Sequence, residues 1–171
     1  MPTSRAVTVP SSEAGRRRAR AAERSELFSK RDESMEQASL PSPVANADSK
    51  TYWDAARERR LLIRRCNSCG QLHFMPRHLC PICWSDQLEW VDAAGGGSVH
   101  SFTIIRRASD QAFAPLVPYV VALIDLDEGP RMMANIVGSN ALAVKIGDRV
   151  QVTFEDRGGG AMVPQFKRVA A

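Results

Sequence analysis

The chain has 171 residues, of which 44% are hydrophobic and 25% charged, and its formal net charge is +4. This composition is ordinary for a globular protein of one domain, with room for a small satellite. No run of about 18 apolar residues exists, so a membrane span is not expected. The N-terminus lacks the apolar core of a signal peptide, so we expect a cytoplasmic protein whose thiols stay reduced.

The first 47 residues differ from the rest of the chain. They include GRRRARAAERSE and QASLPSPVANAD, which are rich in Arg, Ala, Ser and Pro and poor in large apolar residues. Because such a segment cannot bury enough apolar surface to offset chain entropy, we predict a disordered extension over 1–47, with a transient helix over 13–35 at most. A further hypothesis is that Met35 is the native start, which intact-mass analysis of the native protein would test.

The next segment, DSKTYWDAARERRLLIRR, predicts a helix followed by a short strand. Asp48 or Ser49 can cap a helix that runs to about Arg59. The LLIRR run then has the composition of a strand. We expect Tyr52 and Trp53 on the helix to pack against the module that follows, and an interface anchor is the alternative role.

All four cysteines lie in RRCNSCGQLHFMPRHLCPICW, as two C-x-x-C pairs. Each pair places two sulfurs on one tight turn, and two such turns facing each other form a tetrahedral site. Two disulfides are the weaker interpretation in a reducing compartment. The sequence therefore predicts one metal ion bound by Cys66, Cys69, Cys80 and Cys83.

Zinc is favoured over iron, because iron would imply electron transfer and no redox partner or flavin site accompanies the cysteines. A zinc ion bound by four sulfurs has no open position for water, so the site would be structural. Four thiolates and one zinc ion contribute a net −2, so the chain would carry about +2 in place of its formal +4. The basic pI of about 9.1 is therefore weak evidence for a nucleic-acid partner.

Strands dominate from Ser98 onward. Five segments are rich in β-branched or aromatic residues: 98–107, 118–127, 131–138, 148–156 and 163–170. Residues 127–130 and the Gly147-Asp148 pair predict turns, and the three glycines at 95–97 predict a linker or a wide turn. Five short strands without an amphipathic helix predict an OB-fold barrel over 94–171, with an SH3-like barrel as the main competitor. The helix and zinc ribbon would then occupy 48–93, and the fold class is mainly β.

Candidate catalytic residues are few, and we predict none. The side chains weighed for other roles are three histidines and three acidic residues: His73, His78, His100, Asp125, Asp127 and Glu128. The first two histidines lie in the ribbon loop and could replace a cysteine as ligand, whereas the third is expected to be packed or solvent-facing. The acidic residues crowd one hairpin, where a solvated turn is favoured over a cation site. No Ser-His-Asp order or phosphate-binding loop is present.

The order of these parts resembles a family of zinc-ribbon-plus-OB-fold proteins, once filed as a domain of unknown function and now described as acyl-CoA-associated. The resemblance covers roughly 48–171. It rests on the ribbon with its segment 76–83, the LEW and G-x-V-x-SFT transition, the VALIDLDEG strand and turn, and the IGDRV turn. Two positions depart from it. Trp84 stands where the second knuckle usually has glycine, so that knuckle is expected to relax or use another geometry. ERRL replaces the more usual E-G-[KR]-L, which should lengthen the helix slightly.

The resemblance implies a small partner of thiolase-like proteins. The ribbon and its leading helix would face the thiolase, the barrel would help to enclose or pass an acyl-CoA substrate, and the reacting residues would lie mainly in the partner. Acyl transfer, condensation and retro-aldol cleavage are the reactions of such assemblies. The four cysteines match the family's ligand positions, and no catalytic position can be transferred. Arg106, Arg107 or Lys145 could hold the adenosine diphosphate of CoA.

Two alternatives remain open. OB-folds and zinc ribbons both occur in nucleic-acid-binding proteins, and fold alone does not decide function. From Ser98 onward, however, eight basic residues face seven acidic ones, which is too small an excess for a groove that follows phosphates. A rubredoxin-like electron carrier is the second alternative, and it requires iron.

Overall fold

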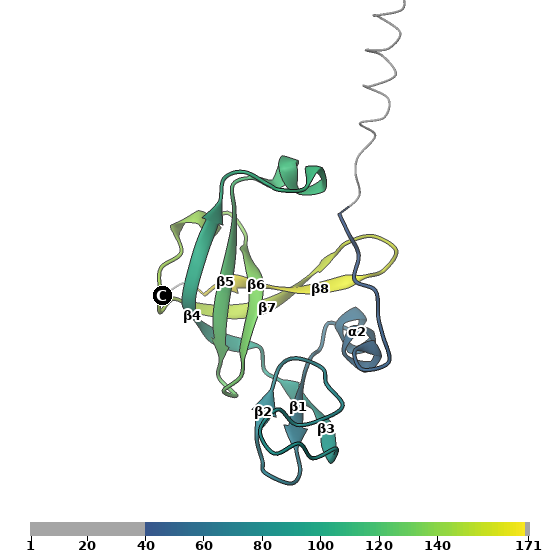
Figure 1. Ribbon diagram of the computed structural model, residues 1–171. Helices are drawn as coiled ribbons and strands as arrows, with labels where there is room; N and C mark the ends of the chain where they lie inside the picture. Colours follow the sequence, from purple (N-terminus) through teal and green to yellow (C-terminus); the bar gives the residue numbers. More distant parts are fainter. Residues whose placement is uncertain (1–39, 170–171) are drawn as a thin grey trace, which may run out of the picture. The chain divides into compact units, whose positions relative to one another are not determined.

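The computed structural model describes residues 40–169 of the chain. The predicted helix over 13–35 and the hypothesis concerning Met35 lie outside these residues. Within them, a short helix and a three-stranded ribbon precede a five-stranded barrel (Figure 1). No helix in the described part of the chain is long and apolar enough to cross a membrane.

Helix α2 (Lys50–Arg57) buries Tyr52, Ala55 and Ala56 on one face. Ser49 occupies the N-cap position as predicted, but its hydroxyl donates to the side chain of Asn46 at 2.7 Å and does not cap the helix. The helix is shorter than predicted, because a Schellman motif ends it. The Arg59 N–H donates to Ala56 O and the Arg60 N–H to Ala55 O, at 2.9 and 3.0 Å.

Arg59 adopts a left-handed conformation with φ of 60° in this motif. It takes the place of the glycine that the resemblance has at this position, so the expectation that ERRL lengthens the helix is wrong. The backbone therefore has the left-handed conformation that glycine adopts freely, and Arg59 adopts it at a cost in strain.

The ribbon is a sheet with strand order β2-β1-β3. Strand β1 (Leu61–Cys66) is the predicted LLIRR strand, and it pairs antiparallel with β2 (Leu72–His73) and β3 (Leu88–Ala93). Strand β3 was not predicted from the sequence. Its pairing runs from Cys66 opposite Leu88 to Leu61 opposite Ala93, so it spans the whole of β1.

The barrel is closed, in the order β4-β5-β6-β8-β7. Its strands are β4 (Gly96–Ile105), β5 (Tyr119–Leu126), β6 (Arg131–Val137), β7 (Arg149–Asp156) and β8 (Met162–Arg168). Strands β6 and β8 pair in parallel at two positions, and the other pairings are antiparallel. This closure confirms the predicted OB-fold. Two short 3-10 helices, η1 (Gln111–Leu116) and η2 (Ala141–Ala143), connect strands of the barrel.

Of the three glycines at 95–97, Gly95 lies in the short connection between β3 and β4, with φ of 75°, whereas Gly96 and Gly97 do not form the predicted linker or wide turn. They are buried at the start of β4, which pairs with both β5 and β7 at this point. A Cβ atom on Gly97 would lie 2.6 Å from the carbonyl oxygen of Asp125. The glycine therefore permits the close approach of two strands in the barrel wall.

The hydrophobic core is continuous from the helix through the ribbon to the barrel. One cluster of buried side chains contains Tyr52 of α2, Leu61 of β1, and Val99, Ile124 and Phe166 of the barrel. Helix α2 also packs against β8. Residues 48–93 and 94–171, which the sequence separates by their patterns, thus share one core.

Candidate metal centre

Two similar turns, or knuckles, carry the four cysteines. In the first, the Gly70 N–H donates to Cys66 O at 2.8 Å, and in the second the Trp84 N–H donates to Cys80 O at 3.0 Å. The residue after the second cysteine is left-handed in both turns, with φ of 74° at Gly70 and 62° at Trp84. The expectation that tryptophan would relax the second knuckle or change its geometry is therefore wrong.

The four sulfur atoms lie within 4.8 Å of one another. The Sγ atoms of Cys66 and Cys83 are 3.6 Å apart, and those of Cys69 and Cys80 are 3.7 Å apart. A tetrahedral zinc site with Zn–S bonds of about 2.3 Å requires sulfurs about 3.8 Å apart. The side chains therefore fit one tetrahedral metal ion. Ligation by these four cysteines stays a prediction.

Backbone N–H groups favour the thiolate form at two of the cysteines. Burial by itself raises the pKa of Cys66, but hydrogen bonds from the backbone N–H groups of Cys69 and Ser68 and from neighbouring thiols lower it to about 6. The pKa of Cys80 is also lowered, first by a hydrogen bond from the backbone N–H of Cys83. At Cys69 and Cys83 backbone hydrogen bonds lower the pKa too, but hydrogen bonds with other thiols and burial outweigh them and raise it. The ribbon by itself therefore favours the thiolate, the form that binds metals, at Cys66 and Cys80.

The three histidines do not join this cluster. His73 is buried, with its Nδ1 atom 3.1 Å from Met75 O, and burial lowers the pKa of its ring. His78 is exposed and lies 4.0 Å from Asp48. His100 lies in β4 beside Asp125 and Arg131. Within residues 40–169, the four cysteines form the one group of three or more candidate metal ligands.

The acidic hairpin is occupied by hydrogen bonds and ion pairs. Asp125 pairs with Arg131 at 2.6 Å, and Asp127 pairs with Arg149 at 2.6 Å. Glu128 accepts a hydrogen bond from the Ala94 N–H at 2.6 Å. Two of these carboxylates are therefore paired with arginines of neighbouring strands and the third with a backbone N–H, so the hairpin does not resemble a cation site.

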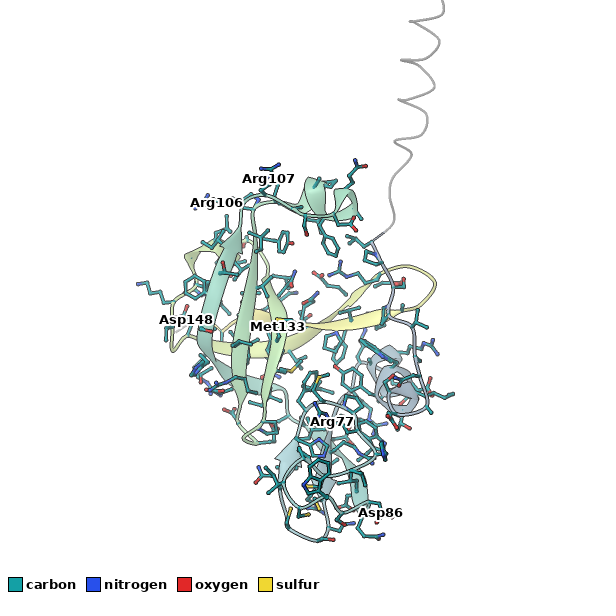
Figure 2. The ribbon with its side chains drawn as sticks, viewed as in Figure 1. Arg77, Asp86, Arg106, Arg107, Met133 and Asp148 are labelled. Carbon is teal, nitrogen blue, oxygen red and sulfur yellow. The ribbon has the colours of Figure 1, made fainter. Side chains whose placement is uncertain are left out.

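The three basic residues considered for CoA do not converge. Arg106 and Arg107 project from the end of β4 (Figure 2). Lys145 lies near the beginning of that strand, because the Gly147 N–H donates to Val99 O at 2.8 Å. Seven residues of strand separate Val99 from Arg106, roughly 20 Å at the usual rise. One diphosphate cannot contact both ends.

The ribbon also exposes large apolar side chains. Met75, Ile82 and Trp84 have 57%, 65% and 73% of their surface exposed, and we call them the ribbon apolar cluster. Met75 and Ile82 line a hollow of about 320 Å³ that reaches the barrel hairpin at Pro130. Of these three residues the sequence singles out Trp84 alone, as a departure from glycine in the second knuckle. Met75 and Ile82 give no such signal, because apolar residues between cysteines usually fill the small core of such a ribbon.

Comparison with known proteins agrees with this architecture. Residues 53–89 match the family described as "ChsH2, rubredoxin-like zinc ribbon domain", and residues 90–155 match "ChsH2, C-terminal OB-fold domain". The chain is 33% identical over 121 residues to a DUF35 domain-containing scaffold protein of Methanocaldococcus jannaschii, which covers 67% of this chain and 85% of that protein. The chain belongs to the DUF35 family. The predicted resemblance is thus confirmed.

Other DUF35 relatives are named as subunits of enzymes. The chain is 36% identical over 127 residues to a probable enoyl-CoA hydratase alpha subunit of Thermomonospora curvata, covering 74% of this chain but 39% of that subunit. It is 39% identical over 74 residues to the benzoylsuccinyl-CoA thiolase subunit BbsA of Geobacter metallireducens, covering 43% of this chain and 48% of that subunit. A solved structure of an Ltp2-ChsH2(DUF35) aldolase superposes with a TM-score of 0.67 at 35% identity, covering 75% of this chain and 99% of that one.

Proposed function

We propose that this DUF35 protein is a non-catalytic subunit that docks on a thiolase-like enzyme through its zinc ribbon and shares an acyl-CoA substrate with it. The observation that carries the proposal is the ribbon apolar cluster, because large apolar side chains exposed together on a rigid module are typical of protein interfaces. The names of the relatives support it, since they include a scaffold protein, a thiolase subunit and an aldolase complex.

Zinc would have a structural role in this function. The sulfur spacing fits a tetrahedral ion, and four thiolates leave no position for a water molecule or a substrate. Cys66 and Cys80 are fully buried, so the ion would fix both turns, of which the second carries Ile82 and Trp84 of the ribbon apolar cluster. The residues that hold the metal would be Cys66, Cys69, Cys80 and Cys83.

The partner would supply the chemistry. Acyl transfer needs a nucleophile activated by an adjacent base, and no side chain predicted from the sequence has such a role. Of the histidines, His73 contacts a backbone carbonyl, His78 is exposed on the ribbon, and His100 lies beside Asp125 and Arg131. Acyl transfer, condensation or retro-aldol cleavage would therefore take place at residues of the thiolase-like protein.

Affinity purification of the tagged protein from its native host, with metal analysis of the same sample, tests the proposal. We expect a thiolase-like protein, identified by mass spectrometry, and one zinc ion per chain. Nucleic acid in the eluate without a protein partner would favour the single-strand-binding alternative. Iron in place of zinc would favour the electron carrier.

Variants locate the docking surface. Cys80→Ser should abolish both zinc binding and partner binding, because the ribbon folds around its metal. Ile82→Ser should weaken partner binding while zinc is retained. The matched control is Leu142→Ser, since Leu142 is 49% exposed but lies on η2 of the barrel. Equal partner affinity for Ile82→Ser and wild type would show that the ribbon is not the docking module.

A further inference from the structure

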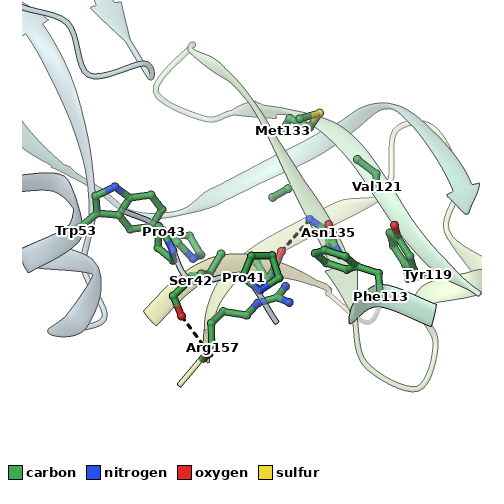
Figure 3. Close-up of a pocket in the computed structure, with 14 residues that line it drawn as sticks. Pro41, Ser42, Pro43, Trp53, Phe113, Tyr119, Val121, Met133, Asn135 and Arg157 are labelled. Carbon is green, nitrogen blue, oxygen red and sulfur yellow. Dashed lines mark hydrogen bonds between the residues drawn. The ribbon is translucent and has the colours of Figure 1, made fainter. Parts of the chain in front are cut away.

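A second hollow, distinct from the metal centre, lies against the barrel. We call it the barrel groove: it has a volume of about 520 Å³ and is lined mainly by apolar side chains. Trp53 of α2 and Phe113 of η1 stand on either side of it, and Met133 of β6 also lines it (Figure 3). Met133 is 67% exposed although it sits on a barrel strand, so the groove presents an apolar surface to solvent.

The segment before the helix forms one wall of this groove. Pro41, Ser42 and Pro43 line it between Trp53 and Phe113, and we call residues 41–43 the strap (Figure 3). One hydrogen bond joins the strap to the barrel, from Ser42 Oγ to Arg157 O at 3.3 Å. The two prolines have no N–H group to donate. Pro41 and Ser42 are exposed and Pro43 is half-buried, so the strap is only partly buried against the barrel and a ligand can displace it.

A single cation faces the same space. Arg157, in the turn between β7 and β8, lines the groove with its guanidinium carbon 6.0 Å from the ring centre of Phe113. Its Nε atom is buried and has no hydrogen-bond partner in the part of the chain that the structure describes. Within residues 40–169, no carboxylate forms an ion pair with it. A partly buried guanidinium without a counter-charge favours an anion in its vicinity.

We propose that the barrel groove binds an apolar chain that carries a carboxylate, with Arg157 pairing the carboxylate and the strap leaving the groove as the chain enters. The apolar lining selects the chain, and the planar guanidinium offers the two-pronged geometry that a carboxylate accepts. The acyl group of a CoA thioester has no free carboxylate, so the ligand inferred here is a free carboxylic acid, and the inference goes beyond the proposed function. The groove, the strap and the arginine do not depend on that function.

Strap and ligand compete in this scheme. When only a fraction of molecules has the strap displaced, the apparent dissociation constant is the intrinsic value divided by that fraction. A strap that is open in about one molecule in ten would therefore weaken binding about tenfold. Loosening the strap should restore the intrinsic affinity without any new contact to the ligand.

Decanoate carrying a terminal bromine is a suitable probe, because bromine quenches tryptophan fluorescence on contact. Trp53 lines the groove, whereas Trp84 and Trp90 do not. We expect saturable quenching in the purified full-length chain, and its loss in Trp53→Phe. Decanol should bind more weakly and decyltrimethylammonium more weakly still, since neither pairs with a guanidinium. Absence of quenching in both the wild type and the strap variant below would overturn the proposal.

Two sets of variants test the arginine and the strap. Arg157→Met should weaken decanoate binding about tenfold and leave the affinity for decanol unchanged. Arg157→Lys should retain most of the affinity for decanoate. The control is Arg107→Met, because Arg107 is exposed and lies outside the groove. P41G/P43G should strengthen decanoate binding about tenfold, with Val44→Gly as its control because Val44 is 92% exposed and lies outside the groove.

Each outcome has one meaning. Equal affinity for decanoate and decyltrimethylammonium would overturn the role of Arg157, and equal affinity of P41G/P43G and wild type would overturn the role of the strap. Partner docking is measured separately, by co-purification with the wild-type chain. Absence of docking with intact decanoate binding would contradict the proposed function alone, and absence of decanoate binding with intact docking would contradict this inference alone.

Discussion

Trp84→Gly should make the protein more stable. Trp84 has φ of 62°, a conformation that costs a residue with a Cβ atom roughly 1–2 kcal/mol, whereas glycine adopts it freely. Glycine adds conformational freedom to the unfolded chain, which offsets about 0.4–1 kcal/mol of this gain. Because 73% of the Trp84 side chain is exposed, little packing is lost. The expected net gain in the free energy of unfolding is about 0.5–1 kcal/mol.

The reverse substitution in the other knuckle is a matched control. Gly70 has φ of 74°, and no atom lies within 4 Å of the position that a Cβ atom would take. Gly70→Ala therefore introduces backbone strain without a clash, and it should lower the free energy of unfolding by about 0.5–1 kcal/mol. The two variants should shift stability by similar amounts in opposite directions.

Urea unfolding at a fixed free zinc concentration measures both effects, because bound metal stabilises the folded chain by mass action. For a slope of about 2 kcal/mol per molar urea, the midpoints should move by about 0.3–0.5 M. A lower midpoint for Trp84→Gly would refute the reasoning, since it would show that the indole contributes more contact energy than its exposure indicates. Partner affinity should nevertheless fall by about 30-fold in this variant, as for loss of an interface tryptophan.

Three further predictions concern the remaining structure. Arg59→Gly should raise the free energy of unfolding by about 0.5–1 kcal/mol, measured by urea unfolding, because Arg59 holds the left-handed position of the helix end. Gln165→Ala should lower it by about 1–3 kcal/mol in the same assay, because the buried Gln165 Oε1 accepts a hydrogen bond from a backbone N–H of β6 at 2.8 Å. The Lys145 backbone N–H, followed by the Arg168 side chain, holds the pKa of Asp148 below its usual range. Asp148 therefore stabilises the fold above the unfolded pKa of about 3.9, and this contribution is lost as pH falls through the folded pKa. Asp148→Asn should be less stable than wild type near pH ~7 and should approach it near pH ~3 when the unfolding midpoints are compared.

The parts that the sequence predicted correctly depend on local chemistry. Two C-x-x-C turns define their own geometry, and the alternation of apolar residues in the five strands sets which side faces the barrel core. The order of elements then follows from short connections. The sulfur cluster and the barrel could therefore be anticipated from residues that lie close together in the chain.

The errors concern residues that adopt a conformation against their own preference or that contact residues far away in the sequence. The end of α2 follows from hydrogen bonds of Arg59 and Arg60 to the last helical turn, against the preference of arginine itself. Gly97 is part of a strand because the Asp125 carbonyl approaches it, which no local pattern reveals. The barrel groove joins the strap to Arg157 across 115 positions of the chain. A lone arginine after a strand gives no signal of such a site.

The short parallel pairing of β6 with β8 determines which part of this chain can be fused to another protein and still fold. Strands β6 and β8 pair only at Ile136 with Phe166 and at Val137 with Lys167, and α2 packs against β8. A chain that began at residue 94 would lose the helix that supports one of the two strands at this short junction. Gene fusions that transplant the OB-fold alone should therefore yield aggregation-prone products, whereas fusions that carry the segment from Lys50 onward should yield folded ones.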